Sequence, residues 1–171
     1  MHLTRFTDLS LRVLMYLTFK NRTSLVTVNE LAQKFKWSRN HIVKVAHFMN
    51  ARGWIVSFRG RGGGIRLARD PSEYRIGDLV RQLEGGDEPL IDCENPRCTF
   101  FEACRFRFIK DEASEAFYSK LNDYTLSSLA LTPEAQGLFG RLSEEARANG
   151  SDKFSTRMLI RPRASRKHDD F

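Results

Sequence analysis

Three cysteines within twelve residues are the part of this sequence best suited to chemistry. They are Cys93, Cys98 and Cys104, and the chain has no other cysteine. Thiolates are soft ligands that suit iron–sulfur clusters and zinc. Three thiolates on one loop can hold three corners of a cluster and leave the fourth corner to another ligand. We therefore expect an open corner here, at which a small reactive molecule acts.

Two other interpretations of the cysteines remain open. The first is structural zinc, but closed zinc sites normally have four protein ligands at tight spacing. Here four and five residues separate the cysteines, and no histidine lies near them in sequence. The second is a metal-free regulator whose thiols are oxidised directly. Iron analysis of protein prepared without air distinguishes a cluster from both.

The charge of the chain is concentrated in its first part. Of 171 residues, 28 are Lys or Arg and 21 are Asp or Glu, but residues 1–70 hold 13 basic and only 3 acidic residues. A basic half is the electrostatic signature of a nucleic-acid-binding domain. No apolar run approaches the roughly 18 residues that a membrane span needs. The first residues do not predict a secretory segment, because Asp8, Ser10 and Arg12 interrupt the apolar residues that follow Arg5. We expect a cytoplasmic protein, in which clustered cysteines more often bind metal or react with oxidants than form disulfides.

The basic part predicts a winged helix-turn-helix. Apolar residues at helical spacing indicate a helix over about 5–20. Thr27, with Glu30 three residues later, predicts a capping box for a short second helix, and Ser38 caps a third helix that runs to about Ala51 and stops at Gly53. Two strand-forming segments, 54–58 and 65–67, flank a glycine-rich turn and form a hairpin. The predicted fold class is mainly α with this small β-hairpin.

The third helix and the wing are the candidate DNA-reading elements. Ile42, Val45, Ala46 and Met49 share one face of the helix and should pack inward. The residues that we expect to contact DNA are Ser38, Arg39, Asn40, His41 and Lys44 from the helix, with Arg59 and Arg61 from the wing. Asn and Arg suit adenine and guanine edges. The alternative is an ordinary solvated helix face. A phosphate-cradling nucleotide loop is disfavoured, because the glycine-rich turn leads into a strand and not into a helix.

The second half predicts a dimerisation element. A short helix over Ile76–Leu83 precedes the cysteine loop, and a long helix follows it with one apolar stripe. The stripe consists of Phe106, Ile109, Ala113, Phe117, Leu121 and Tyr124. A second copy of the helix is its natural partner. The expected organisation is a winged-helix domain (1–85), a cluster-binding loop (86–104), a dimerisation helix with a C-terminal helix (105–148), and a basic mobile tail (149–171).

Four motifs in order resemble the NsrR-type repressors of the bacterial iron–sulfur winged-helix family, which also includes IscR. They are residues 3–8 (LTRFTD), 38–41 (SRNH), 63–67 (GGIRL) and 76–80 (IGDLV), followed by the three cysteines. The resemblance implies a homodimer with crossed long helices. It also implies a 4Fe–4S cluster, with 2Fe–2S less favoured, held by Cys93, Cys98, Cys104 and Asp8 of the other subunit. IscR-like members carry a ligating histidine where this chain has Arg107, which cannot ligate iron.

The resemblance also implies a function. We expect a transcriptional repressor, not an enzyme, that binds double-stranded operator DNA and releases it when nitric oxide attacks the cluster. A regulator that senses redox state or cluster supply, as IscR-like members do, is the alternative within the family. The operator sequence and the regulated genes do not follow from the sequence.

Overall fold

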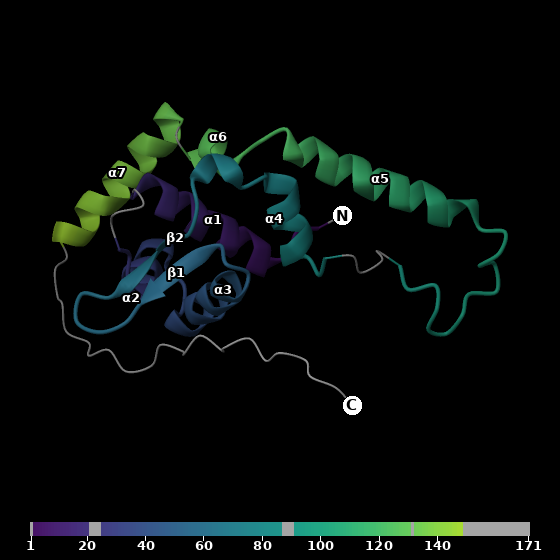
Figure 1. The fold of residues 1–171 in the computed structure, drawn as a ribbon, viewed down its shortest axis with the longest axis horizontal. Coiled ribbons are helices and arrows are strands. Elements are labelled where there is room, and N and C mark those ends of the chain that lie inside the picture. Colours follow the sequence, from purple (N-terminus) through teal and green to yellow (C-terminus); the bar gives the residue numbers. More distant parts are fainter. Residues whose placement is uncertain (1, 21–24, 87–90, 131, 149–171) are drawn as a thin grey trace, which may run out of the picture.

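The computed structural model describes residues 2–20, 25–86, 91–130 and 132–148. The predicted basic tail, residues 149–171, lies outside the described residues. Figure 1 shows a body of packed helices with the hairpin at one side. One long helix extends from this body to the cysteine loop. None of the helices in the described ranges is long and apolar enough to cross a membrane.

Three helices and a hairpin form the predicted winged helix-turn-helix, which is called the head below. The helices are α1 (Arg5–Phe19), α2 (Val28–Phe35) and α3 (Arg39–Ala51). Each begins at a hydroxyl residue that accepts a backbone N–H three residues later: Thr4 from Thr7, Thr27 from Glu30, and Ser38 from His41. Such caps satisfy N–H groups that have no partner inside the helix.

The capping box predicted at Thr27 forms only in part. Thr27 caps α2 as expected, but the Glu30 carboxylate accepts a hydrogen bond from the Tyr16 hydroxyl at 2.6 Å. The acidic side chain therefore ties α2 to α1. A tertiary partner of this kind cannot be read from the local spacing that predicted the box.

The wing is the antiparallel pair β1 (Ile55–Phe58) and β2 (Gly64–Leu67), with Ile55 opposite Leu67 and Phe58 opposite Gly64. Val26, just before α2, exchanges two backbone hydrogen bonds with Ile65, of 2.9 and 2.8 Å. The wing is thereby joined to the start of the helix-turn-helix.

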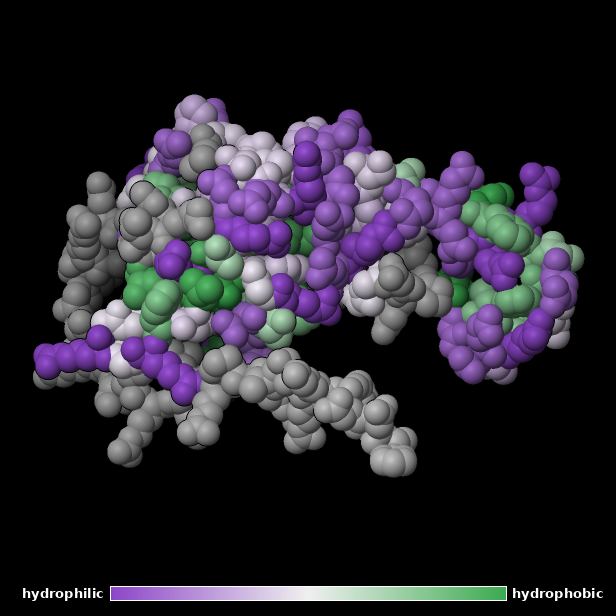
Figure 2. All heavy atoms as spheres, in the orientation of Figure 1, coloured by the Kyte–Doolittle hydropathy of each residue, from purple (hydrophilic) through white to green (hydrophobic). Residues whose placement is uncertain are grey.

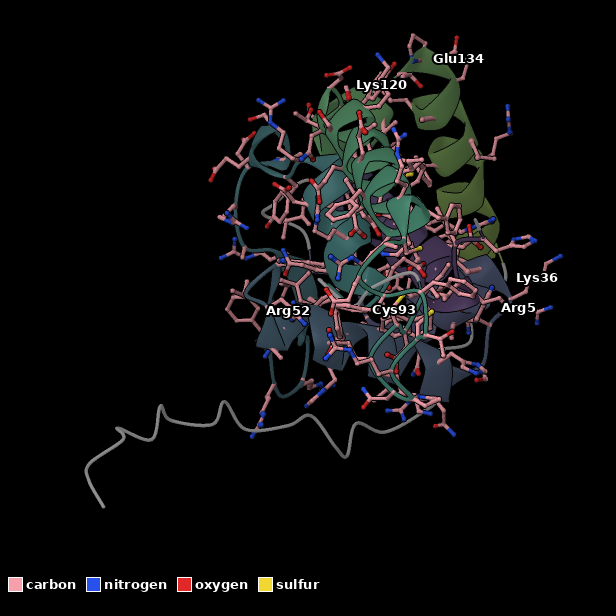
Figure 3. The ribbon with its side chains drawn as sticks, turned by 90° about the vertical axis from the view of Figure 1, so that its right-hand side faces the viewer. Arg5, Lys36, Arg52, Cys93, Lys120 and Glu134 are labelled. Atoms are coloured by element: carbon pink, nitrogen blue, oxygen red, sulfur yellow. The ribbon has the colours of Figure 1, made fainter. Side chains whose placement is uncertain are left out.

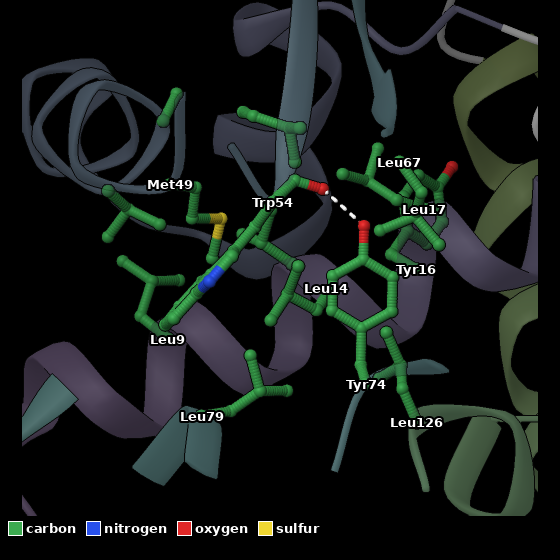
Figure 4. Close-up of a cluster of buried hydrophobic side chains, with 14 of the residues drawn as sticks. Leu9, Leu14, Tyr16, Leu17, Met49, Trp54, Leu67, Tyr74, Leu79 and Leu126 are labelled. Atoms are coloured by element: carbon green, nitrogen blue, oxygen red, sulfur yellow. Dashed lines mark hydrogen bonds between the residues drawn. The ribbon is translucent and has the colours of Figure 1, made fainter. Parts of the chain in front are cut away.

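One apolar core holds the head together, and Figure 4 shows its centre. The Tyr74 hydroxyl donates to the Trp54 carbonyl at 2.7 Å and accepts the Arg69 N–H at 3.0 Å, so this buried polar group is fully used. Most of the largest fully buried side chains come from α1, α2, α3 and both strands: Tyr16, Leu9, Leu14, Leu17, Leu31, Ile42, Met49, Ile55, Ile65 and Leu67.

Helix α4 (Ile76–Leu83) attaches the long helix α5 (Arg105–Asn122) to the head. Gly77 lets the two backbones approach, because a Cβ there would lie 2.1 Å from the Tyr118 carbonyl oxygen. The Asn122 amide accepts the Asp78 N–H at 3.0 Å and donates to the Asp78 carboxylate at 2.8 Å. These contacts close the C-terminal end of α5 onto α4.

The predicted stripe of α5 is therefore wrong at one end. The helix ends at Asn122, so Tyr124 lies beyond it, where its carbonyl accepts the Ile76 N–H. Tyr118, outside the predicted stripe, is the buried aromatic residue against α4, with Phe117 and Leu121 partly buried beside it. At the other end Phe106, Phe108 and Ile109 are 60%, 62% and 54% exposed.

Three further elements complete the body. The sequence did not predict the 3₁₀ turn Pro71–Glu73 or the short helix α6 (Leu126–Ala130), but it did predict the C-terminal helix, α7 (Pro133–Ala148). The buried Phe139 of α7 packs its ring against Tyr16 and Phe19, with centroids 5.9 and 5.5 Å apart. Helix α7 thus folds back onto the head.

Candidate nucleic-acid interface and cysteine loop

Helix α3 separates its residues as the sequence predicted. Its buried face consists of Ile42, Val45, Ala46 and Met49, at most 6% exposed. All five residues expected to contact DNA from this helix are exposed: Ser38, Arg39, Asn40, His41 and Lys44. They cluster at the N-terminal end, which is the end that recognition helices present to base edges.

Local hydrogen bonds orient part of this surface. The Ser38 hydroxyl lies 2.7 Å from Nδ1 of His41, and the Arg39 Nε donates to the Asn29 side-chain oxygen at 3.3 Å. The Asn29 contact ties the start of α3 to α2. Sequence reasoning missed Asn29, since nothing in the local pattern marks a partner ten residues away.

The tip of the wing presents its two arginines to solvent. Arg59 and Arg61 are both exposed, and they alternate with Gly60 and Gly62, which have positive φ values of 92° and 80°. Glycine adopts such φ values without steric cost. On the strands, the Arg66 guanidinium lies 5.4 Å from the centre of the Phe58 ring. The turn therefore carries two exposed basic side chains on a glycine-rich backbone.

The cysteine loop lies at the far end of α5 from α4, and Figure 3 views the molecule from that end with Cys93 labelled. All three thiols are free and partly buried. The Cys98 N–H donates to the Cys93 carbonyl at 2.9 Å, and Cys104 is the residue that precedes the first turn of α5. The loop thus brings the backbones of Cys93 and Cys98 together and places Cys104 at the start of the helix.

An acidic side chain shapes the beginning of this loop. Asp92 accepts the N–H groups of Glu94 (2.8 Å) and Asn95 (3.0 Å). Hydrogen bonds to the charged form favour it, and these two lower the pKa of the Asp92 carboxyl below its ordinary value. The turn that leads from Cys93 toward Cys98 is therefore held by a carboxylate.

Asp8 does not join the cysteines within one chain. It lies exposed in the first turn of α1, where its carboxylate accepts Nε of Arg12 at 2.8 Å. Sequence reasoning missed Arg12, although its position four residues after Asp8 on a helix could have indicated the pair. In the ranges that the structure describes, no three His, Cys, Asp or Glu side chains gather closely enough to hold a metal ion.

The donor atoms of the loop fit an iron–sulfur cluster in part. Three partly buried cysteines on one loop match a cluster in ligand type and supply three of its four ligands. They are not yet convergent in the described chain, so the loop must close for all three to bind one cluster.

The profile of the Rrf2 family, described as iron-dependent transcriptional regulators, matches residues 3–132. The chain belongs to the Rrf2 family. It is therefore a DNA-binding transcriptional regulator and not an enzyme. A curated relative, the HTH-type transcriptional regulator NsrR of Shouchella clausii, is 39% identical over 137 residues, which cover 78% of this chain and 91% of that protein.

Solved structures share the fold at lower identity. The oxidised form of CymR from Staphylococcus aureus superposes with a TM-score of 0.62 at 22% identity, over 77% of this chain and 98% of that chain. IscR from T. potens gives 0.57 at 16% identity, over 90% and 94%. These likenesses confirm the winged helix-turn-helix architecture that the sequence predicted.

Proposed function

We propose that this Rrf2 regulator is a homodimeric repressor whose grip on operator DNA depends on an iron–sulfur cluster, and that nitric oxide is its signal. The observation that carries the proposal is the coexistence of two surfaces in one chain. One is a set of exposed polar and basic side chains on the start of α3 and on the wing; the other is a loop with three free thiols that leads into α5. Similarity to an NsrR supports nitric oxide as the signal.

A second copy of the chain is the expected partner of α5. The first turns of α5 expose Phe106, Phe108 and Ile109, and Figure 2 shows apolar side chains gathered at this end of the molecule among charged ones. Covering such side chains is favourable by roughly 25 cal/mol per Å² of apolar surface removed from water. We infer that two α5 helices cover one another there.

The proposed ligands are Cys93, Cys98 and Cys104 of one subunit and Asp8 of the other. When bound, the cluster supplies iron atoms that react with nitric oxide. Asp8 must give up Arg12 to serve as a ligand, and its exposure at 48% of the side chain leaves it accessible to a partner. A carboxylate is a harder ligand than a thiolate, so Asp8 is the weakest of the four. We favour four irons over two, following the resemblance to NsrR-type proteins.

Loss of the ligand that joins the subunits would then change how the two heads are held. In the dimer, the start of α3 of each subunit enters the major groove with Ser38, Arg39, Asn40, His41 and Lys44. The wing contacts the adjacent phosphate backbone or minor groove through Arg59 and Arg61. Half-sites one helical turn apart, about 34–36 Å, or a multiple of that spacing, suit such dimers. A coupling free energy of about 1–3 kcal/mol changes affinity by 5–150-fold.

A titration tests the proposal directly. Holo-protein reconstituted without air is titrated with nitric oxide while operator binding and bound iron are measured in parallel. Binding should fall in step with the loss of the cluster's visible absorption. Operator binding that ignores nitric oxide but responds to iron supply or oxidants would favour the cluster-status alternative instead.

The free, partly buried cysteines are also compatible with a second function, a regulator without metal whose thiols are oxidised directly. In that case protein prepared without air would contain no iron and would still respond to thiol oxidants. Iron analysis before the titration separates the two functions.

A further inference from the structure

The ring of Phe101 is one of the places at which the cysteine loop contacts the long helix. Phe101 lies between Cys98 and Cys104, and the guanidinium of Arg107, in the first turn of α5, lies 4.3 Å from the centre of its ring. The guanidinium of Arg97, next to Cys98, lies 4.7 Å from the same centre. One aromatic ring thus contacts two cations, one from the cysteine loop and one from α5.

Further contacts fix this group within the loop. The Phe101 N–H donates to the Cys98 carbonyl at 3.1 Å, and Arg97 forms an ion pair with Glu102. Phe101 and Cys93 line the same hollow, together with Arg107 and Lys110 of α5. Phe101 is therefore linked by backbone or side-chain contacts to the surroundings of both Cys93 and Cys98.

The neighbouring Phe100 supplies a contrast within the same loop. Its side chain is 73% exposed, whereas that of Phe101 is partly buried under the two arginines. The two residues have the same chemistry and adjacent positions, so they differ chiefly in what they contact.

We propose that Phe101 is a positioning residue that holds the cysteine loop against the start of α5 through Arg97 and Arg107. The inference rests on the proposed function for its purpose, because the loop would pass the state of its thiols to the dimerising helix through this ring. Arg107 thereby has a role that does not involve ligation. The contact itself exists without any cluster, so it can be tested on the apo-protein.

The first experiment measures the accessibility of the thiols. Reduced apo-protein is mixed with an aromatic disulfide reagent, and the rate at which the three thiols react is followed for wild type, Phe101→Ala, Phe101→Tyr and Phe100→Ala. A cation–π contact at an exposed site contributes about 0.5–1 kcal/mol, so removing two should raise the rate about 5–30-fold in Phe101→Ala. Phe101→Tyr keeps the ring face and should react like wild type, as should Phe100→Ala.

The second experiment asks whether the contact reaches α5. Hydrogen exchange of residues 109–113 should accelerate in Phe101→Ala and in Arg107→Gln, while residues 118–122 against α4 and the core of α1 exchange unchanged. Unchanged exchange in the core also shows that the variants fold.

Two results would overturn the inference. Equal thiol reaction rates for Phe101→Ala and Phe100→Ala would mean that the ring does not hold the loop. Faster thiols without faster exchange at the start of α5 would mean that the loop and the helix are not joined through it. Neither measurement uses a cluster, nitric oxide or DNA, so failure here is distinguishable from failure of the proposed function.

Discussion

At the scale of single residues, Asp8 is placed so that its structural and proposed functional roles can be separated. Its only ion pair in the described residues is with Arg12, and both side chains are about half exposed. Exposed pairs of this spacing contribute about 0.3–0.5 kcal/mol. Removal of the carboxylate should therefore affect folding little.

We predict that Asp8→Ala leaves the melting temperature nearly unchanged but makes the reconstituted cluster decay faster. The matched control is Arg12→Ala, which breaks the same ion pair and keeps the carboxylate. Cluster lifetime is followed by visible absorption in the absence of air. Equal lifetimes in Asp8→Ala and wild type would remove Asp8 from the ligand set.

A second prediction at the scale of residues concerns Arg61, which lies exposed at the tip of the wing. Removing one cation that neutralises a phosphate lowers the slope of log affinity against log salt by about 0.9. Arg61→Ala should therefore weaken operator binding and reduce the slope by about that amount. Lys120→Ala, which removes one exposed cation of α5 near α4, should leave the slope unaltered. A slope that Arg61→Ala does not change would place the wing away from the phosphates.

At the scale of elements, the joint between α4 and α5 depends on close backbone approach and on polar contacts around it. Arg81 donates two hydrogen bonds to Glu115, of 2.6 and 2.7 Å, and lies 4.4 Å from the centre of the Tyr118 ring. The bonds from Arg81 hold the pKa of the Glu115 carboxyl below its ordinary value. The joint is thus stabilised when Glu115 is ionised, and this contribution is lost as the pH falls through its lowered pKa.

Two glycines in helices should respond to alanine with opposite signs. At Gly77 a Cβ would meet backbone at 2.1 Å, and overpacking typically costs about 1–3 kcal/mol. At Gly137 of α7 a Cβ would meet nothing within 4 Å, and alanine should stabilise the helix by about 0.5–1 kcal/mol. Urea unfolding measures both changes. A neutral Gly77→Ala would contradict the close packing of α4 against α5.

The elements also show where sequence reasoning succeeds and where it stops. The range of α1 follows from apolar spacing, the start of α3 from its hydroxyl cap, and the position of the hairpin from strand-forming residues around glycines, and all three are confirmed. The predicted stripe of α5 omits Tyr118, because the burial of this residue depends on how α4 packs against α5, which the spacing of apolar residues along α5 does not encode. Tyr118 is buried against α4, which can approach α5 closely because residue 77 is glycine. Helix α6 is attached by the hydrogen bond from the Leu126 N–H to the Tyr74 carbonyl, which joins separate segments.

The candidate site divides in the same way. The exposure of Asn40 and Lys44 follows from the helical period alone, as does the burial of Ile42 on the opposite face. The contacts of Arg107 with Phe101 and of Arg39 with Asn29 could not be predicted, because each joins separate segments whose packing is set in three dimensions.

At the scale of the whole molecule, the exposed start of α5 makes a prediction about assembly. Ile109→Glu places a charge among apolar side chains that we propose are covered in the dimer, and a buried unpaired charge is costly. The variant should run as a monomer in size-exclusion chromatography with light scattering, whereas we expect wild type to run as a dimer.

Leu138 on α7 is the control, because it is 49% exposed and also apolar. Leu138→Glu should leave the mass unchanged. A dimeric Ile109→Glu would show that the second copy does not cover this end of α5.

The double hydrogen bond between Val26 and Ile65 has a consequence for what any signal can alter. Because the wing and the helix-turn-helix are fastened to each other, each head should travel as a rigid unit. DNA sequences with randomised sites can be selected separately with protein that has received the signal and with protein that has not. Both selections should recover the same preferred bases in each half-site. They should differ only in how tightly the DNA is bound and in the spacing between the two half-sites.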